Sequence, residues 1–329
     1  MKTDKKIYLI DIGRLTGLTI ALVVVGHLVT GQDINTPGLE WYKFLKRYLY
    51  SFHMPLFMFL SGFLFFYTLP KISNKQDYVR FINKKIKRLL PSFIFFSVLI
   101  FVIKISISKL VVVDNTVNNY SDYFKVFYDP VYSFAGFLWY VYVLFQYYLI
   151  FPILLRFVRP VIIVVVSLGL YFIEATHLFA IDFFLKFLVF FSLGVLSAQY
   201  YPRYKKILMD YKWLFIVVFL CASVVFYFIT IPKLIMGVFS IFGLHSLILV
   251  LSPSKYKVLS TLGLYSFSIY LMNNLVTGFV KAIGFRFFEI SYSNFLVIAL
   301  LMVFLGITIP IVIKKYIINK IPKVGKYIG

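Results

Sequence analysis

Charged residues are scarce in this sequence. Only 14% of the residues are Asp, Glu, Lys or Arg, whereas 61% are hydrophobic. A typical soluble domain is about one quarter charged and about half apolar. Helices exposed to water need a polar outer face, which so few charged residues do not provide. The composition therefore excludes an ordinary soluble domain and predicts an all-α integral membrane protein.

Cysteine is nearly absent as well. The single residue, Cys221, excludes an intrachain disulfide and any cysteine-rich metal site, so we expect no metal cofactor. The first apolar run, about 8–30, is not a short hydrophobic region followed by a small-residue cleavage site. We expect it to be a retained membrane helix.

Acidic residues are far outnumbered by basic ones. The chain has 12 Asp and Glu against 34 Lys and Arg, which gives a net charge of +22. In a soluble protein this excess would suggest a nucleic-acid partner. Here most of the cations fall in alternate loops and near both termini, as the positive-inside rule requires of a membrane protein. We therefore expect membrane lipid around this protein, and no nucleic acid.

Long apolar runs recur along the chain, and a bilayer span needs about 20 mostly apolar residues. We predict a polytopic bundle of about ten transmembrane helices. An even number places both termini on one side, and their lysines assign that side to the cytoplasm. Without a fixed repeat or a long linker, one domain over residues 1–329 is expected. The predicted spans are 8–30, 51–69, 91–113, 137–157, 160–178, 183–201, 213–231, 233–251, 259–283 and 292–313.

The connecting segments differ in charge. Segment 71–88 carries seven basic residues and one acid and is predicted to be a cytoplasmic loop, whereas 114–136 carries mainly acids and is predicted to be external. Segment 31–50 is the exception, because it should be external but contains three cations between apolar residues. It is either an amphipathic helix in the membrane interface or part of a cleft for an anionic glycan. Its cations are Lys43, Lys46 and Arg47.

Small residues recur at helical spacing in two of the predicted spans. Gly13, Gly17 and Ala21 form a small-xxx-small stripe, which predicts close packing against another helix. Ser61 and Gly62 predict close packing or a local kink in the second span. We assign the stripe to packing and not to chemistry.

His27 is the clearest chemical candidate. It follows an apolar run, and ionisable side chains within a membrane are costly enough that each is a functional candidate. A neutral imidazole can accept a proton from a hydroxyl and later return it, or can carry an acyl group briefly. The alternative is a buried histidine that only bonds to a neighbouring helix.

Several segments together resemble the acyltransferase 3 family. They are the stretch from Asp11 to His27, the Phe-His-Met-Pro-Leu-Phe and Leu-Ser-Gly-Phe motifs within 52–63, and the Lys-Arg-Leu-Leu-Pro that ends at Pro91. Residues 137–141 and 266–271 resemble the family's Leu-Trp-Phe-Leu and Ser-x-x-Ile-Tyr-Leu segments. The family contains bacterial membrane O-acetyltransferases, including fucose 4-O-acetylase-like proteins. The resemblance covers nearly the whole chain.

This resemblance implies a multi-pass protein of the cytoplasmic membrane. Its expected reaction is acyl transfer from acetyl-CoA to a hydroxyl of a sugar or cell-envelope polysaccharide. His27 matches the family's catalytic histidine in the first helix. We expect the phosphates of coenzyme A to bind a set of cations, and the acceptor to bind a second set of residues. These sets are Arg14, Lys84, Lys85 and Arg88 for coenzyme A, and His53, Trp139, Glu174 and Asn273 for the acceptor.

The sequence departs from the family pattern at two positions. The family usually has Arg or Lys eleven residues before the histidine, where this chain has Thr16. Arg14, two residues earlier, lies nearly opposite His27 on an ideal helix. Lys104 lies at a similar predicted depth and is our candidate for the missing catalytic cation. Asn273 stands where many members have histidine.

Two other classes of function compete with acyl transfer. One is a glycan transporter or flippase, which the absence of a cation at Thr16 favours slightly. Paired halves with helices broken by Gly or Pro, typical of transporters, are not visible in the sequence. The other is an inactive scaffold of a glycan-synthesis complex. The sequence carries no signal for an oligomeric state.

Overall fold

The computed structural model describes residues 10–29, 39–107, 115, 117–251, 257–287 and 292–321, without the side chains of 292 and 293. These residues form helices and connecting turns, and no strand occurs among them, so the predicted all-α class is confirmed. By their contacts they form two compact units. Unit 1 comprises Met1–Leu60 and Ser197–Lys315, and unit 2 comprises Ser61–Leu196 and Tyr316–Gly329. The single domain over 1–329 stays a prediction.

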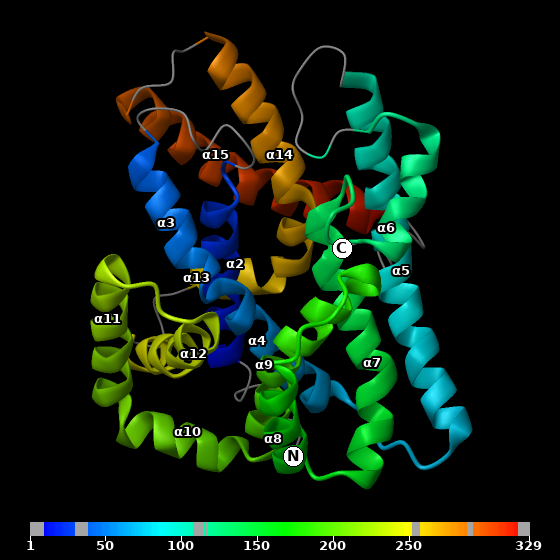
Figure 1. Ribbon diagram of the computed structural model, residues 1–329, viewed down its shortest axis with the longest axis vertical. Coiled ribbons are helices and arrows are strands. Elements are labelled where there is room, and N and C mark those ends of the chain that lie inside the picture. The colour runs from blue at the N-terminus through cyan, green and yellow to red at the C-terminus, as the bar shows by residue number, and fades with distance from the viewer. Residues whose placement is uncertain are drawn as a thin grey trace. The chain divides into compact units, whose positions relative to one another are not determined.

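Unit 1 is organised around α2 (Ile10–Gly26), the helix that precedes His27. Helix α2 packs against α3, α12, α13, α14 and α15, and α11 packs along α12 (Figure 1). The start of α4 (His53–Thr68) also belongs to this unit. The other helices of unit 1 are α3 (Glu40–Tyr50), α10 (Tyr201–Asp210), α11 (Lys212–Phe228), α12 (Lys233–Val250), α13 (Lys257–Leu264), α14 (Ser266–Phe287) and α15 (Tyr292–Val312).

Glycines bring α2 and α13 into direct backbone contact. A Cβ atom added to Gly17 would overlap the carbonyl of Leu259, and one added to Gly263 would overlap the carbonyl of Gly13. Only glycine allows two helices to approach so closely at both positions. The small-residue stripe predicted to pack is therefore confirmed as a packing surface.

Unit 2 is held by aromatic packing. Phe191 contacts Phe65, Tyr147 and Phe151 with ring centroids 5.5, 4.6 and 4.6 Å apart. Gly62 lies against the backbone of Phe191, which confirms the predicted close packing there. The larger helices of this unit are the rest of α4, α5 (Lys75–Ile107), α7 (Trp139–Phe157), α8 (Pro160–Leu170) and most of α9 (Ile181–Gln199). Its short helices are η2 (Tyr120–Phe124), α6 (Lys125–Tyr128), η3 (Gly136–Leu138), η4 (Leu178–Ala180) and η6 (Ile318–Lys320).

The basic segment before the third predicted span is helical, which corrects the predicted loop. Helix α5 runs without interruption from Lys75 to Ile107 and includes Pro91 in its interior. Lys, Arg and Gln are good helix formers, and residues 75–90 contain no Gly or Pro. The basic residues therefore extend the membrane helix instead of joining two helices.

The described helices support fewer membrane spans than the apolar runs predict. Six described helices are long and apolar enough to cross a membrane, or seven if the bent pair Tyr201–Asp210 and Lys212–Phe228 forms one span. Helix α8 corrects the fifth predicted span, because it has 11 residues and ends at Leu170. The polar residues Glu174, Thr176 and His177 fall in the connection after it. Ten spans and two cytoplasmic termini stay predictions.

Candidate functional site

His27 directly follows the last residue of α2. Its backbone N–H donates to the Val24 carbonyl at 3.1 Å, and its ring Nδ1 lies 2.7 Å from the Val23 carbonyl oxygen. A carbonyl only accepts, so Nδ1 carries the proton and Nε2 keeps its lone pair. The side chain is half-buried. The turn of α2 thus fixes His27 in the tautomer that can accept a proton at Nε2.

Tyr42 of α3 holds the turn that carries His27. The Tyr42 hydroxyl accepts hydrogen bonds from the backbone N–H groups of Leu28 and Val29, at 2.9 and 3.3 Å. It donates to the Val25 carbonyl at 2.9 Å. The side chain is fully buried. One phenol therefore satisfies the Val25 carbonyl, which belongs to the last turn of α2 where carbonyls lack internal partners, and two N–H groups of the turn that follows the helix.

His53, the first residue of α4, lies beside His27. Their ring centroids are 5.6 Å apart, and Tyr50 contacts both rings, at 5.1 Å from His27 and 4.8 Å from His53. His53 Nδ1 donates to the Leu49 carbonyl at 2.6 Å, which again leaves Nε2 as an acceptor. His53 is 0% exposed, and within the described residues its Nε2 has no hydrogen-bond partner. Two imidazoles with basic Nε2 atoms and a phenol thus form one cluster.

Lys46 adds a cation to this cluster. Its Nζ donates to the Val29 carbonyl at 2.7 Å and lies 5.3 Å from the ring centroid of Tyr50. Sequence reasoning noted this cation but did not connect it with His27. The contact depends on α3 packing against α2, which spacing along the chain does not reveal.

Asn273 lies on α14, another helix that packs against α2. Its side chain is buried, and its Nδ2 donates to the carbonyls of Ile269 and Tyr270 at 2.8 and 2.9 Å. Within the described part of the chain, Asn273 Oδ1 has no hydrogen-bond partner. The amide is therefore oriented by its own helix, with its oxygen left to accept.

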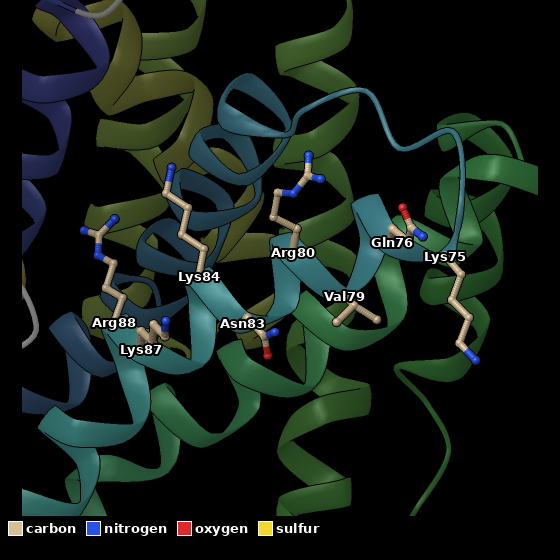
Figure 2. Close-up of a pocket in the computed structure, with 8 residues that line it drawn as sticks. All are labelled: Lys75, Gln76, Val79, Arg80, Asn83, Lys84, Lys87 and Arg88. Carbon is tan, nitrogen blue, oxygen red and sulfur yellow. The ribbon is translucent and has the colours of Figure 1, made fainter.

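A basic pocket lies along the first half of α5, in unit 2. Its volume is about 1010 Å³, and Arg80, Lys84 and Arg88 project from one face of the helix (Figure 2). These three residues recur at every fourth position, which places them on one helical face. Arg80 also lies 3.7 Å from Asp77. The described lining residues are Lys75, Gln76, Val79, Arg80, Asn83, Lys84, Lys87 and Arg88, none of which is acidic.

Lys85 does not line this pocket. It is 9% exposed, and its Nζ lies 4.3 Å from the ring centroid of Tyr148 and 5.2 Å from that of Phe81. A cation over aromatic faces is held by the ring quadrupoles and by packing of its stem. Of the predicted phosphate-binding residues in α5, the structure therefore brings Lys84 and Arg88 together and directs Lys85 into the aromatic core of unit 2.

The remaining predicted site residues belong to separate places. Arg14 is a half-buried residue of α2. In unit 2, Lys104 donates to the Asn115 carbonyl at 3.4 Å. Trp139 packs on Phe187 with centroids 4.9 Å apart, and Glu174 is exposed. The predicted role of Lys104 as a substitute for the missing cation stays untested.

Sequence reasoning missed a buried polar cluster at the other end of α2. The carboxylate of Asp11 accepts a hydrogen bond from the Tyr201 hydroxyl and lies 3.5 Å from Lys205 Nζ and 3.4 Å from His245 Nε2. Nδ1 of His245 lies 3.0 Å from the Tyr204 hydroxyl. His245 interrupts the apolar helix α12, so the rule that singled out His27 could have found it. The cluster joins α2 to α10 and α12.

The helices and the half-buried histidine define a multi-pass membrane protein with a site suited to proton transfer. The family model described as an acyltransferase domain matches residues 9–315. The chain therefore belongs to the acyltransferase 3 family. The resemblance inferred from the motifs is confirmed, and acyl transfer is the chemistry of the class.

A curated relative supports the same assignment. Nodulation protein NolL from Mesorhizobium japonicum is 25% identical over 209 residues. The alignment covers 63% of this chain and 52% of that protein, so it spans about half the length of the relative. No solved structure matches the chain.

Proposed function

We propose that this protein is a membrane O-acetyltransferase that moves an acetyl group from acetyl-CoA to a hydroxyl of a sugar or cell-envelope polysaccharide. The proposed location is the cytoplasmic membrane. The single observation that carries the proposal is the state of His27, whose Nδ1–H is held by Val23 while Nε2 keeps a lone pair. Membership of an acyltransferase family makes acyl transfer the reaction for which this lone pair is used.

In the proposed reaction His27 Nε2 accepts the proton of the acceptor hydroxyl. The acceptor oxygen attacks the carbonyl carbon of the acetyl thioester, so a C–O bond forms and the C–S bond breaks. The leaving thiolate takes the proton from His27, and the imidazole returns to its neutral form. General base catalysis of this kind contributes about 10²- to 10⁴-fold in rate.

The basic pocket on α5 is the proposed site for the phosphates of coenzyme A. Arg80, Lys84 and Arg88 share one helical face, and cations bind phosphate through charge-assisted hydrogen bonds (Figure 2). No acid lines the described part of the pocket. These observations support an anionic ligand there.

The test replaces His27 with Gln, which keeps a polar side chain of similar size but cannot accept and return a proton. We expect acetyl-CoA-dependent acetylation of surface glycan, measured by mass spectrometry, to fall at least about 10²-fold. The purified protein should show the same loss of acceptor-dependent thiol release. Membrane abundance should change little, because His27 is only half-buried.

His177→Gln is the matched control, because His177 is exposed and lies in unit 2 beside Asp129. It should retain acetylation. Full acetylation by His27→Gln would exclude His27 as the base. If deletion of the whole protein changed glycan export but not acetylation, the protein would be a transporter and not an enzyme. If deletion changed neither export nor acetylation, the scaffold hypothesis would be favoured.

A further inference from the structure

The cations around the histidine cluster lie on the predicted external side of the membrane, so the positive-inside rule does not explain them. The charge pattern predicts that the carboxyl end of α2 and the start of α12 face the outside, where the positive-inside rule disfavours Lys and Arg. Nevertheless α3 carries Lys43, Lys46 and Arg47, and α12 begins with Lys233. Among described residues 39–53 and 229–233, Glu40 is the one acid. This local excess of positive charge therefore requires an explanation other than membrane topology.

Two of these cations act directly on the histidines. Lys46 Nζ is bonded to the carbonyl of Val29, two residues beyond His27, and its charge acts on the His27 imidazole. The charge of Lys233 acts on His53. Arg47, in contrast, stacks over Phe44 and Phe226, with its guanidinium carbon 5.6 and 5.7 Å from the ring centroids. Lys46 and Lys233 therefore each place a positive charge where it acts on one of the two imidazoles, with Lys46 fixed there by its bond to Val29.

The imidazole pair also has an unused acceptor. His53 Nε2 is buried, and it has no partner among the described residues. An unsatisfied buried acceptor costs about 1–3 kcal/mol, so such an atom points to a hydroxyl or water that the described residues do not supply. A hydroxyl donor and a negative charge are both offered by an acidic sugar.

We propose that the acceptor is an anionic sugar, and that Lys46 binds its carboxylate or phosphate beside His27. The inference rests on the proposed acyl transfer and names the class of its acceptor. Lys233 adds to the positive field from the side of His53. The acceptor hydroxyl then faces His27 Nε2, while the anionic group is held by the Lys46 ammonium group, which is bonded to the Val29 carbonyl two residues beyond His27.

Lys46 has a second role that the test must separate. By donating to Val29 it also holds a carbonyl of the turn just beyond α2, near the negative end of the helix dipole. Loss of this bond would affect neutral and anionic sugars alike. A difference between the two kinds of sugar is therefore the readout that a structural role does not change.

The experiment measures binding by the purified full chain in nanodiscs of phosphatidylcholine, which has no net charge. The probes are methyl glucoside, methyl glucuronide and methyl glucoside 6-phosphate, with calorimetry as the readout. We expect at least one anionic sugar to bind about tenfold more tightly than the neutral sugar, as for a hydrogen bond to a charged group. Lys46→Gln should reduce this preference below about twofold, and Lys46→Arg should retain it. Lys43→Gln is the matched control, because Lys43 is exposed on the same helix, and it should behave as wild type.

Three results would overturn the inference. They are equal binding of all three sugars, no binding of any, and a preference that survives Lys46→Gln. The third of these results would indicate a lipid role if Lys46→Gln also alters thermal stability only in nanodiscs with phosphatidylglycerol. Because binding needs no catalysis, His27→Gln should keep the preference. Equal binding of all three sugars by the wild-type protein, with transfer to a neutral sugar intact, therefore refutes this inference alone. Retained transfer in His27→Gln instead refutes the proposed function.

Discussion

Replacing Tyr42 with phenylalanine removes one oxygen atom and with it three hydrogen bonds at the end of α2. The lost partners are the N–H groups of Leu28 and Val29 and the carbonyl of Val25, at 2.9, 3.3 and 2.9 Å. Each buried group left unsatisfied costs about 1–3 kcal/mol, and the longest bond contributes least. We therefore expect Tyr42→Phe to lower the free energy of unfolding by about 2–4 kcal/mol.

The same change should reduce activity more than stability alone explains. The three backbone groups flank His27, so their release lets the turn move, and a displacement of about 1 Å in a reacting group can cost about 10²-fold in rate. The assay is acceptor-dependent release of coenzyme A thiol by purified protein, at a temperature where the variant stays folded. Thermal unfolding is measured on the same sample.

Tyr48→Phe on the same helix provides the matched control. The Tyr48 hydroxyl bonds to Ser223 Oγ at 2.6 Å, on α11, and makes no described contact with the His27 turn. We expect this variant to lose some stability but to keep its activity at permissive temperature. If Tyr42→Phe also kept full activity, the claim that Tyr42 positions His27 would be wrong.

Three further predictions follow from the packing, the basic pocket and the topology. Gly17→Ala should lower stability by about 1–3 kcal/mol because its Cβ meets α13, whereas Gly13→Ala, whose Cβ meets nothing within 4 Å, should be neutral or slightly stabilising in thermal unfolding. Lys84→Gln should raise KM for acetyl-CoA roughly three- to tenfold with little change in kcat, and an unchanged KM would place the donor elsewhere. With the native cysteine replaced by serine, a cysteine at Asn83 should react with impermeant reagents only from the cytoplasm and one at Asn118 only from outside, and the reverse pattern would invert the predicted topology.

Most of the helical architecture can be predicted from composition and periodicity. Apolar runs long enough for a bilayer mark helices regardless of their neighbours, because backbone groups in lipid must bond within their own segment. The observed helix α12, Lys233–Val250, almost coincides with its predicted span. The fifth predicted span and the predicted loop over 71–88 were wrong because apolar length alone does not show where a helix begins or ends.

His27 could be singled out from the sequence because placing a histidine within a membrane costs free energy, whichever helices pack around it. The same reasoning applied to His245 would have marked it, but not its partner, since Asp11 lies 234 residues away along the chain. Pairings over such a separation depend on which helices become neighbours. No local pattern encodes them.

The sequence by itself determined that this chain is a helical membrane protein of an acyltransferase family with a histidine at the end of its first helix. These properties depend on local hydrophobicity and on short motifs. Only the tertiary structure decided what surrounds that histidine. Tyr42, Lys46 and His53 reach it because α3 packs against α2 and leads into α4, and because the end of α2 offers backbone groups that a neighbouring side chain must satisfy.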